Sequence, residues 1–312
     1  MEIKQISCIL AIAEEGSITR AAEKLYMTQS ALNQQLLRLE REVGVELFDR
    51  NGRGVTPTFA GRIYLENARK ILELRNETYK QLGDISEVKY GEISIGYTPE
   101  RGVTDFARLY VAFHPRYPGI SFSVEEARSL QLCQLVLQRK ITMAMISYDE
   151  ELPELVYHHP SREHIIVAVP VSSPLAKRAG ENSWQALPII PLEALKDENM
   201  ILSSRKTRMR LILDGAFERA GIQPKILLES SVSRMLISLA ENQMGIAFLP
   251  QAYAGPSDRL VYFRLEEDIY WKVAMVTHRS TYLNKAERDF IALYASFHSG
   301  EPETNTGEKT AP

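Results

Sequence analysis

The sequence predicts an α/β protein of three parts: a small helical domain with a β-hairpin, one long helix, and a larger domain of two α/β lobes. Two short amphipathic helices and a Gly-rich hairpin predict the first part. An uninterrupted helical pattern of about 24 residues predicts the second. Strand and helix patterns alternate twice in the remaining chain, which is typical of parallel sheets and predicts the third.

Two short helices separated by a tight turn follow a first helix that we predict over residues 3–15. Ser17 is the expected N-cap of the earlier helix, whose apolar stripe comprises Ile18, Ala21, Ala22 and Leu25. Thr28 is the expected N-cap of the later helix, whose stripe comprises Leu32, Leu36, Leu39 and Val43. Small alanines let the helices cross closely, so the earlier helix braces the later one as in a helix-turn-helix.

The outer face of the later helix carries amides, a hydroxyl and arginines instead of the usual mixture of Glu and Lys. Such groups hydrogen-bond base edges and phosphates, and an α-helix fits a major groove. We therefore predict DNA contacts by the residues on or beside this face: Thr28, Gln29, Ser30, Asn33, Gln34, Leu37 and Arg38. A plain helical hairpin in a larger core is the alternative interpretation of this stretch.

Residues 48–55 predict a hairpin, in which Gly52 and Gly54 supply positive φ angles. Arg50 and Arg53 on this wing, and Thr58 after it, are expected DNA contacts. The net charge of the chain is −3, and residues 1–58 hold seven basic and eight acidic side chains. DNA affinity must therefore come from local placement of arginines, from helix N-termini and from dimerisation.

Taken together, AxAEEGSITRAAEKLYMTQSALNQQLLRLE and GVELFDRNGRGVTPTFAG closely resemble the N-terminal domain of LysR-type transcriptional regulators. The resemblance implies a winged helix-turn-helix that binds double-stranded DNA sequence-specifically, and it leaves RNA polymerase open as a further partner. Asn33-Gln34 stand where the family often has Ser-Arg, and Leu37 where it has Arg. Phe59 replaces a common Glu. We expect the same docking with a different base preference.

A long helix is predicted from Phe59 to about Leu82, which at 1.5 Å per residue is about 36 Å. Its apolar seam comprises Ile63, Tyr64, Ala68, Ile71, Leu72, Tyr79 and Leu82. We expect the seam to meet the same helix of a second subunit; packing on its own chain alone is the alternative. The resemblance implies a homodimer through this helix and a homotetramer built as a dimer of dimers. Residues 83–91 are the expected hinge.

The β-α-β-α-β pattern occupies residues 92–146 and recurs over residues 200–249, with a late strand at 271–277 and a last helix at 285–298. Two such lobes look like the periplasmic-binding-protein fold, which is also the effector-binding region of the LysR-type family. Arg139, Thr142 and Gln243 stand where that family commonly has Gly, Asp and Gly.

We assign the chain to four segments. Residues 1–58 form the DNA-binding domain, and residues 59–90 the linker helix and hinge. Residues 91–299 form the effector-binding domain, with lobe I comprising 91–162 and 268–299 and lobe II comprising 163–267. Residues 300–312 are polar and rich in Pro, Gly and Thr, and we expect them to be a disordered tail.

Ligands of open parallel sheets bind beyond the carboxyl ends of the strands. That rule selects mainly Ser and Thr near helix starts, where hydroxyls and free N–H groups hold anions: Thr98, Pro99, Glu100, Ser129, Ser147, Ser203, Ser204 and Thr207. The resemblance implies effector contacts at the positions of Thr98, Ser129 and Ser203. Arg205, Lys206 and Arg208 favour an anionic small-molecule effector, whereas Glu100 favours an amine. N-caps without a ligand are the alternative.

Motifs of common enzyme classes, namely G-x-S-x-G, the P-loop, H-E-x-x-H and C-x-x-C, do not occur, so we expect no enzyme and no cofactor. His158, His159 and His164 lack partners at ligand spacing, so we expect no metal, and residues 157–160 read as a surface connection. We expect Cys8 and Cys133 to be unpaired.

No apolar run approaches the roughly 20 residues of a membrane span, and the N-terminus lacks the pattern of a signal peptide. We therefore expect a cytoplasmic protein with no membrane partner. Two other classes stay open: a solute-binding protein with a helical N-terminal appendage, and an α/β enzyme.

Overall fold

The computed structural model of the 312-residue chain describes residues 2–51, 54–85, 90–99, 101–179 and 187–298. These divide into unit 1, comprising Met1–Val88 and Thr281–Lys285, and unit 2, comprising Lys89–Ser280 and Ala286–Pro312. The predicted tail at 300–312 and four residues of the predicted hinge, 86–89, lie outside the described residues.

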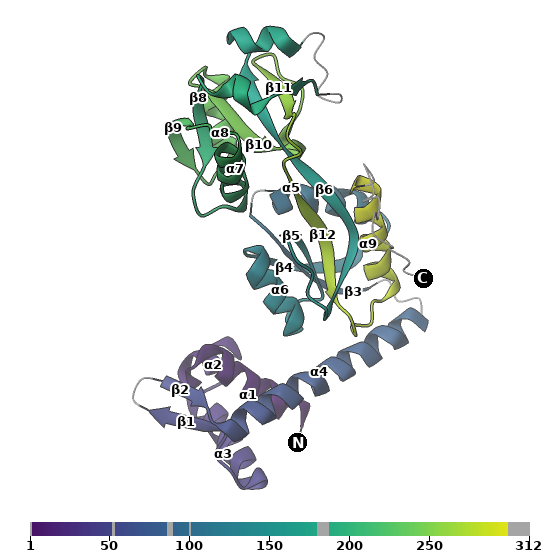
Figure 1. Ribbon diagram of the computed structural model, residues 1–312. Coiled ribbons are helices and arrows are strands. Elements are labelled where there is room, and N and C mark those ends of the chain that lie inside the picture. Colours follow the sequence, from purple (N-terminus) through teal and green to yellow (C-terminus); the bar gives the residue numbers. More distant parts are fainter. Residues whose placement is uncertain (1, 52–53, 86–89, 100, 180–186, 299–312) are drawn as a thin grey trace, which may run out of the picture. The chain divides into compact units, whose positions relative to one another are not determined.

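Residues 2–51 and 54–85 of unit 1 are helical with one β-hairpin and are drawn in purple and blue in Figure 1. Its elements are α1 (Ile3–Glu15), α2 (Ile18–Lys24), α3 (Gln29–Val43), β1 (Phe48–Asn51), β2 (Gly54–Pro57) and α4 (Phe59–Ile85). The first three helices surround a core in which Ile9, Leu32 and Leu36 are fully buried. The sequence therefore predicted the bounds of α1, the inner face of α2 and, except for Val43, the inner face of α3 correctly.

Both predicted N-caps are confirmed. The Ser17 hydroxyl accepts a hydrogen bond from the Arg20 N–H at 3.4 Å, and the Thr28 hydroxyl accepts one from the Ala31 N–H at 3.2 Å. Each cap satisfies one of the N–H groups that the first turn of a helix leaves unpaired. The caps fix where α2 and α3 begin, and with them the turn between the two helices.

Three details of unit 1 differ from the prediction. Val43 is 43% exposed. It is the last residue of α3, and Gly44, with a φ of 74°, turns the chain away from the core directly after it. Ala68 is 1% exposed in the core of its own unit, so it is not free to meet a second subunit. α4 continues through Gly83 to Ile85, so the predicted start of the hinge at residue 83 was wrong.

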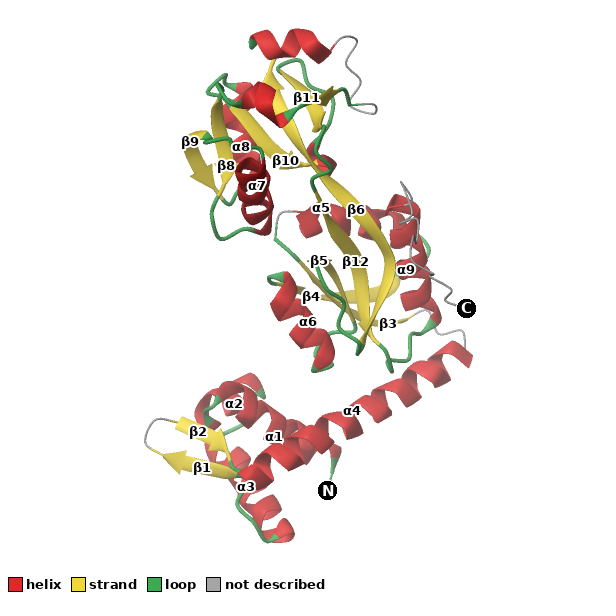
Figure 2. Cartoon of the chain, viewed as in Figure 1, coloured by secondary structure: helices red, strands yellow, loops and turns green. Residues whose placement is uncertain are grey.

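In its described residues, unit 2 contains ten strands connected into one sheet, with helices packed against it (Figure 2). The strands are β3 (Tyr90–Tyr97), β4 (Gly119–Glu126), β5 (Met143–Tyr148), β6 (Leu155–Pro170), β7 (Ile189–Ile190), β8 (Asn199–Ser203), β9 (Lys225–Ser230), β10 (Ile246–Pro250), β11 (Leu260–Leu265) and β12 (Tyr270–His278). The helices are α5 (Arg101–Phe113), α6 (Ser129–Leu137), α7 (Arg208–Arg219), α8 (Ser233–Glu241) and α9 (Lys285–His298), with 3-10 turns at Pro174–Ala179, Leu192–Leu195 and Gln251–Tyr253.

Two parallel triplets of strands lie at the ends of this sheet. The main path runs β4-β3-β5-β12-β6-β10-β8-β9, with β11 pairing β6 and β7. In β4-β3-β5 and in β9-β8-β10 all neighbours are parallel, as the repeated β-α-β-α-β pattern predicts. β12 and β6 between the triplets run antiparallel to their neighbours.

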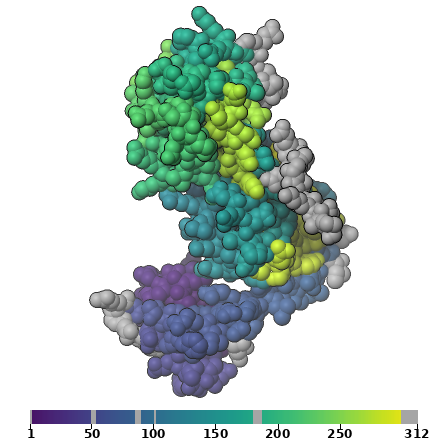
Figure 3. Space-filling view, in the orientation of Figure 1, coloured from purple at the N-terminus to yellow at the C-terminus, as the bar shows by residue number. Residues whose placement is uncertain are grey.

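The long strand β6 changes partner along its length. Residues 155–164 pair with β12, whereas residues 165–170 pair with β10 and β11. This change lies close to residue 163, where we place the boundary between lobe I and lobe II, and we retain those lobe limits as a proposal. In the space-filling view lobe II is the green mass at the top of unit 2, above the teal of lobe I (Figure 3).

Several local predictions for unit 2 were wrong. Residues 157–160 are not a surface connection but part of β6, in which His158 Nε2 contacts the Thr277 hydroxyl at 2.8 Å. Ser147 lies inside β5 instead of after it. β11 was not predicted; its burial does not alternate strictly, since the neighbouring Tyr262 and Phe263 are both buried.

The two substitutions for family glycines are tolerated in a left-handed conformation. Arg139 has a φ of 56° and Gln243 a φ of 64°. After α8, the Gln243 N–H bonds to the Ala240 carbonyl at 2.9 Å and the Met244 N–H to the Leu239 carbonyl at 3.1 Å. This pair of bonds is a Schellman motif, in which glycine is the usual residue. The helix ends are therefore kept, at a cost in backbone strain.

Candidate DNA-binding surface and effector site

The outer face of α3 is exposed, as predicted. Thr28, Gln29, Ser30, Gln34, Leu37 and Arg38 are all exposed, while Leu32, Leu36 and Leu39 on the opposite side are fully buried. The Thr28 and Ser30 hydroxyls lie 3.2 Å apart at the start of the helix. The face therefore presents hydroxyl, amide and guanidinium groups at the N-terminal end of a helix whose other side is fixed in a core.

Asn33 differs from the other residues of this group. It is half-buried, and its Oδ1 is buried without a hydrogen-bond partner among the described residues. Tyr26, which we did not predict, is 98% exposed in the turn before α3 and has a φ of 53°. The exposure of Tyr26 could have been predicted from the sequence, because this large aromatic residue lies in the turn and belongs to neither of the flanking apolar stripes.

The hairpin β1–β2 is confirmed, with Phe48 opposite Pro57 and Asn51 opposite Gly54. The Val55 N–H donates to the Gly16 carbonyl at 3.0 Å, which fixes the hairpin to the turn between α1 and α2. Of the predicted DNA contacts here, Arg53 lies outside the described residues, as does the side chain of Arg50. Thr58 has a structural part, because its hydroxyl donates to the Glu46 carbonyl at 2.8 Å and accepts from the Gly61 N–H at 2.9 Å.

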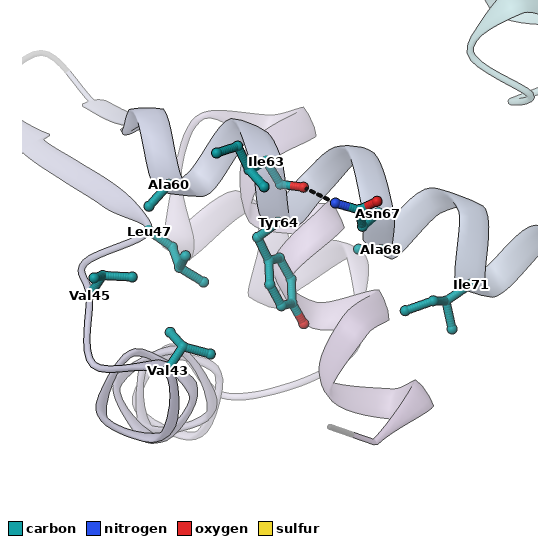
Figure 4. Close-up of a pocket in the computed structure, with 9 residues that line it drawn as sticks. All are labelled: Val43, Val45, Leu47, Ala60, Ile63, Tyr64, Asn67, Ala68 and Ile71. Carbon is teal, nitrogen blue, oxygen red and sulfur yellow. Dashed lines mark hydrogen bonds between the residues drawn. The ribbon is translucent and has the colours of Figure 1, made fainter.

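An apolar groove of about 370 Å³ lies between the end of α3 and the first half of α4 (Figure 4). It is lined by Val43, Val45, Leu47, Ala60, Ile63, Tyr64, Asn67, Ala68 and Ile71. Burial raises the pKa of the Tyr64 phenol, with a smaller contribution from the Glu42 charge. Beyond the groove, Tyr79 and Leu82 of the predicted seam are each more than half exposed along α4, as is Leu74, which we did not include in the seam. The outer part of the predicted seam is thus uncovered within unit 1.

In lobe I the predicted effector residues lie directly after β3, at the start of α6 after β4, and near the end of β5. Thr98 and Pro99 directly follow β3, and Glu100 lies outside the described residues. The Ser129 hydroxyl accepts from the Ser147 N–H at 3.1 Å and lies 3.2 Å from the Ser147 hydroxyl. The structure therefore brings Ser129 and Ser147 together. The Ser129 hydroxyl is the hydrogen-bond acceptor of the Ser147 backbone N–H.

In lobe II the predicted residues gather between the end of β8 and the start of α7. Thr207 is the N-cap of α7: its hydroxyl accepts from the Arg210 N–H at 3.2 Å and donates to the Ser204 carbonyl at 2.9 Å. Ser203 is 3% exposed, and its hydroxyl has no hydrogen-bond partner among the described residues. A buried unpaired hydroxyl is costly, so this one is a natural candidate for a ligand contact.

Arg208, at the start of α7, connects the two groups of residues. Its Nη1 lies 2.6 Å from Oδ1 of Asp149, the residue that follows β5. We did not predict Asp149 as a site residue, although an acidic side chain directly after a buried strand could have been selected by the same rule as Ser147. The ends of β5 and β8 are thereby placed on one side of unit 2.

Within the described ranges, no group of three or more His, Cys, Asp or Glu side chains is placed to hold a metal ion. Cys8 and Cys133 are both free and buried, as expected. Burial raises the pKa of both thiols. No described helix is long and apolar enough to cross a bilayer.

The geometry defines a DNA-binding protein with a winged helix-turn-helix and a two-lobed α/β domain. Residues 3–62 match the family model described as a bacterial regulatory helix-turn-helix protein of the lysR family, and residues 86–297 match the LysR substrate binding domain. The second match alone covers more than half of the 312 residues. The chain belongs to the LysR family of transcriptional regulators.

Relatives and solved structures agree with this assignment. The HTH-type transcriptional regulator YybE of Bacillus subtilis is 27% identical over 80% of this chain and 82% of its own. The nitrogen assimilation regulatory protein nac of Escherichia coli is 26% identical over 81% of this chain and 80% of its own.

Two full-length structures share the fold. An OxyR variant from Pseudomonas aeruginosa matches with a TM-score of 0.68 at 19% identity, over 95% of this chain and 94% of its own. CbnR in complex with its target DNA matches with a TM-score of 0.58 at 20% identity, over 96% of this chain and 100% of its own. The chain is therefore a DNA-binding transcriptional regulator with an effector-binding domain, and the solute-binding alternative is not favoured.

Proposed function

We propose that this regulator reads a two-fold symmetric DNA site with the outer face of α3, as a homodimer through α4, and that a small anionic effector bound between lobes I and II switches it. A cytoplasmic location, the absence of catalytic activity and a tetramer built as a dimer of dimers belong to the same proposal. The observation that carries it is the exposed polar face of α3, opposite a fully buried apolar face.

Gln34 is the residue of this face best suited to read a base. It is exposed near the middle of the first half of α3, and an amide can bind adenine through two hydrogen bonds in the major groove. Arg38, one turn further on and also exposed, is suited to a phosphate or a guanine. Tyr26 stands beside the Thr28 cap, where its hydroxyl can donate to a phosphate.

Gln34→Ala should weaken specific DNA binding by roughly 1–3 kcal/mol and relax the preference at one base position. The measurement is a gel shift against the DNA just upstream of the protein's own coding region, with singly substituted sites as competitors. Gln81→Ala is the matched control, because it removes the same side chain from an exposed position far along α4. Equal base preferences in both variants would remove Gln34 from the reading surface.

The apolar surface of unit 1 supports a dimer. The groove between α3 and α4 and the exposed Leu74, Tyr79 and Leu82 continue along one helix, and a single recognition helix reads too few base pairs for useful affinity. A second copy of α4 carries the same apolar stretch and could therefore cover it along its whole length. A two-fold axis through α4 would also give the two recognition helices the symmetry of a palindromic site.

Leu82→Asp should dissociate the dimer, because it places an unpaired charge in an apolar contact. Leu82 is 56% exposed within unit 1, so the substitution should leave the fold of the subunit intact. Light scattering should show half the particle mass for this variant. Gln81→Asp, which adds the same charge one residue earlier on the helix, should keep the parent mass. An unchanged mass for Leu82→Asp would contradict the α4 dimer.

A thermal-shift screen of small metabolites tests the effector part of the proposal, because a ligand of the folded state raises Tm by mass action. Carboxylates and other anions should be enriched among the compounds that raise Tm. Ser203→Ala should reduce that rise without altering DNA binding in the absence of the compound. A screen in which only amines raise Tm would contradict the anionic class.

A further inference from the structure

The contact between Asp149 and Arg208 joins the two lobes at the proposed effector site. Asp149 belongs to lobe I, one residue after β5, and Arg208 to lobe II, as the first residue of α7. Their Oδ1 and Nη1 atoms are 2.6 Å apart, although the residues are 59 positions apart in the chain. A distance this short is typical of a charge-assisted hydrogen bond between a guanidinium and a carboxylate.

The surroundings of Arg208 are those of an anion site. Its guanidinium side chain is 31% exposed, and it follows Thr207, the N-cap of α7, where the free N–H groups of the first turn add positive character. The buried and unpaired hydroxyl of Ser203 lies at the end of the preceding strand. Burial raises the pKa of Cys133 in α6, and the Arg208 charge lowers it by a smaller amount.

Asp149 is the solvent-exposed carboxylate that contacts Arg208 at this site. Its side chain is 73% exposed, and it stands on the segment that follows β5 and precedes β6. An ion pair this exposed contributes little to stability, so a solute carboxylate can compete with it. Other carboxylates follow directly in the sequence, at Glu150 and Glu151, but the described contact to Arg208 is made by Asp149.

We propose that Asp149 is an internal stand-in for the effector: it occupies Arg208 when no effector is bound, and the carboxylate of an anionic effector takes its place. This inference rests on the proposed function, in which the effector binds between the lobes. It adds the mechanism of the switch, because exchanging a lobe I carboxylate for a solute carboxylate removes one connection between the lobes. The effector then binds the state without the connection more tightly, which is the differential affinity that a switch requires.

The first test needs no ligand. Hydrogen–deuterium exchange of the full chain compares Asp149→Asn with Glu150→Gln, which removes the same charge from the next, exposed residue. In Asp149→Asn the peptides covering residues 147–152 and 204–211 should exchange about two- to fivefold faster, in line with the loss of one exposed ion pair. Glu150→Gln should match the parent protein. Equal exchange in Asp149→Asn and the parent would overturn the connection.

The second test uses acetate, succinate and citrate as probes, with the corresponding amides as neutral controls at equal ionic strength. Apparent Kd values follow from the rise in Tm with concentration. At least one carboxylate should bind Asp149→Asn about two- to fivefold more tightly than the parent and should lose affinity for Arg208→Gln. If the carboxylates bind parent and Asp149→Asn equally, or bind neither, Asp149 is not a stand-in for a carboxylate.

A gel shift on the same variants separates this inference from the proposed function. If the parent protein fails to bind DNA specifically, the proposed function fails while the exchange and titration results still decide the role of Asp149. If DNA binding holds and Asp149→Asn changes neither exchange nor carboxylate affinity, the stand-in is wrong and the proposed function is unaffected.

Discussion

Lobe I and lobe II share the β-α-β-α-β order of elements, but they differ in whether the serine hydroxyls near their strand ends are hydrogen-bonded. Each places the first strand of its β-α-β-α-β pattern at the centre of a parallel triplet: β3 in β4-β3-β5 and β8 in β9-β8-β10. In lobe I, Ser129 and Ser147 satisfy each other. In lobe II, the Ser203 hydroxyl is buried and unpaired, beside a buried arginine. The shared topology supplies the scaffold, and the pairing of individual hydroxyls decides which edge is structural and which is ready for a ligand.

Arg210 is the buried arginine beside Ser203. It is 3% exposed, and its guanidinium donates to Asp214 at 2.6 Å, to Glu229 at 2.8 Å and to the Ser203 carbonyl at 3.2 Å. Arg210→Met should destabilise the protein by about 3 kcal/mol, the low end of the range for a broken buried pair, because both carboxylates are partly exposed. Chemical denaturation checks this, with the exposed Arg219→Met expected to stay within about 0.5 kcal/mol of the parent.

The same variant should change the response to acid. The hydrogen bond from Arg210 holds the pKa of Glu229 below its ordinary value of 4.5. A carboxylate with a lowered pKa in the folded state stabilises the fold above pH 4.5, and this stabilisation is lost as the pH falls through the folded value. Arg210→Met should therefore lose less stability on acidification below pH 4.5 than the parent. Parallel acid curves for the two proteins would contradict the pairing.

Substituting the serines should separate the lobes directly. Ser129→Ala removes the acceptor of the Ser147 N–H and should cost about 1–2 kcal/mol. Ser203→Ala removes a hydroxyl that has no partner and should be neutral or stabilising by up to about 1 kcal/mol. Denaturation of both variants without any added solute is the measurement. Equal losses would show that both edges are structural.

The helix ends offer the smallest effect. Gly221 and Gln243 occupy the same position of Schellman motifs after α7 and α8, with φ angles of 66° and 64°. Gln243→Gly should stabilise the protein by about 0.5–1 kcal/mol, because it relieves a left-handed conformation at an exposed residue. Gly221→Ala should destabilise it by about 1 kcal/mol, although its Cβ would meet no atom within 4 Å. A change of the same sign in both variants would contradict the strain.

Sequence reasoning succeeded where local chemistry determines structure. Ser17 and Thr28 each cap a helix through a hydrogen bond within three residues, and such a bond leaves a readable pattern. α9, predicted over residues 285–298, has those bounds for the same reason: an amphipathic pattern with a clear start. The exposed face of α3 followed from periodicity alone.

Sequence reasoning failed where distant segments decide. Residues 157–160 form part of β6, in which Tyr157 and His158 pair with β12, more than a hundred residues later, and the register shifts before Ser161. Val43 was predicted on the inner face of α3 but is exposed, whereas Ala68 was predicted at a subunit contact but is buried in its own unit. Periodicity alone does not say which part of an apolar stripe is covered, or whether the same chain covers it. The ion pair of Asp149 with Arg208 could not be predicted, since it depends on two lobes meeting at one point. The unpaired Ser203 hydroxyl likewise depends on what its neighbours leave unbonded.

The place of β12 in the sheet has a consequence for how the protein folds during its synthesis. β5 lies between β3 and β12, and its residues are almost all buried. During synthesis β5 leaves the ribosome long before β12, which begins at Tyr270. β5 is therefore an apolar edge strand, unpaired on its β12 side, for on the order of ten seconds at bacterial elongation rates. Lobe II is complete before lobe I can close, and the nascent chain is most prone to aggregate in that interval.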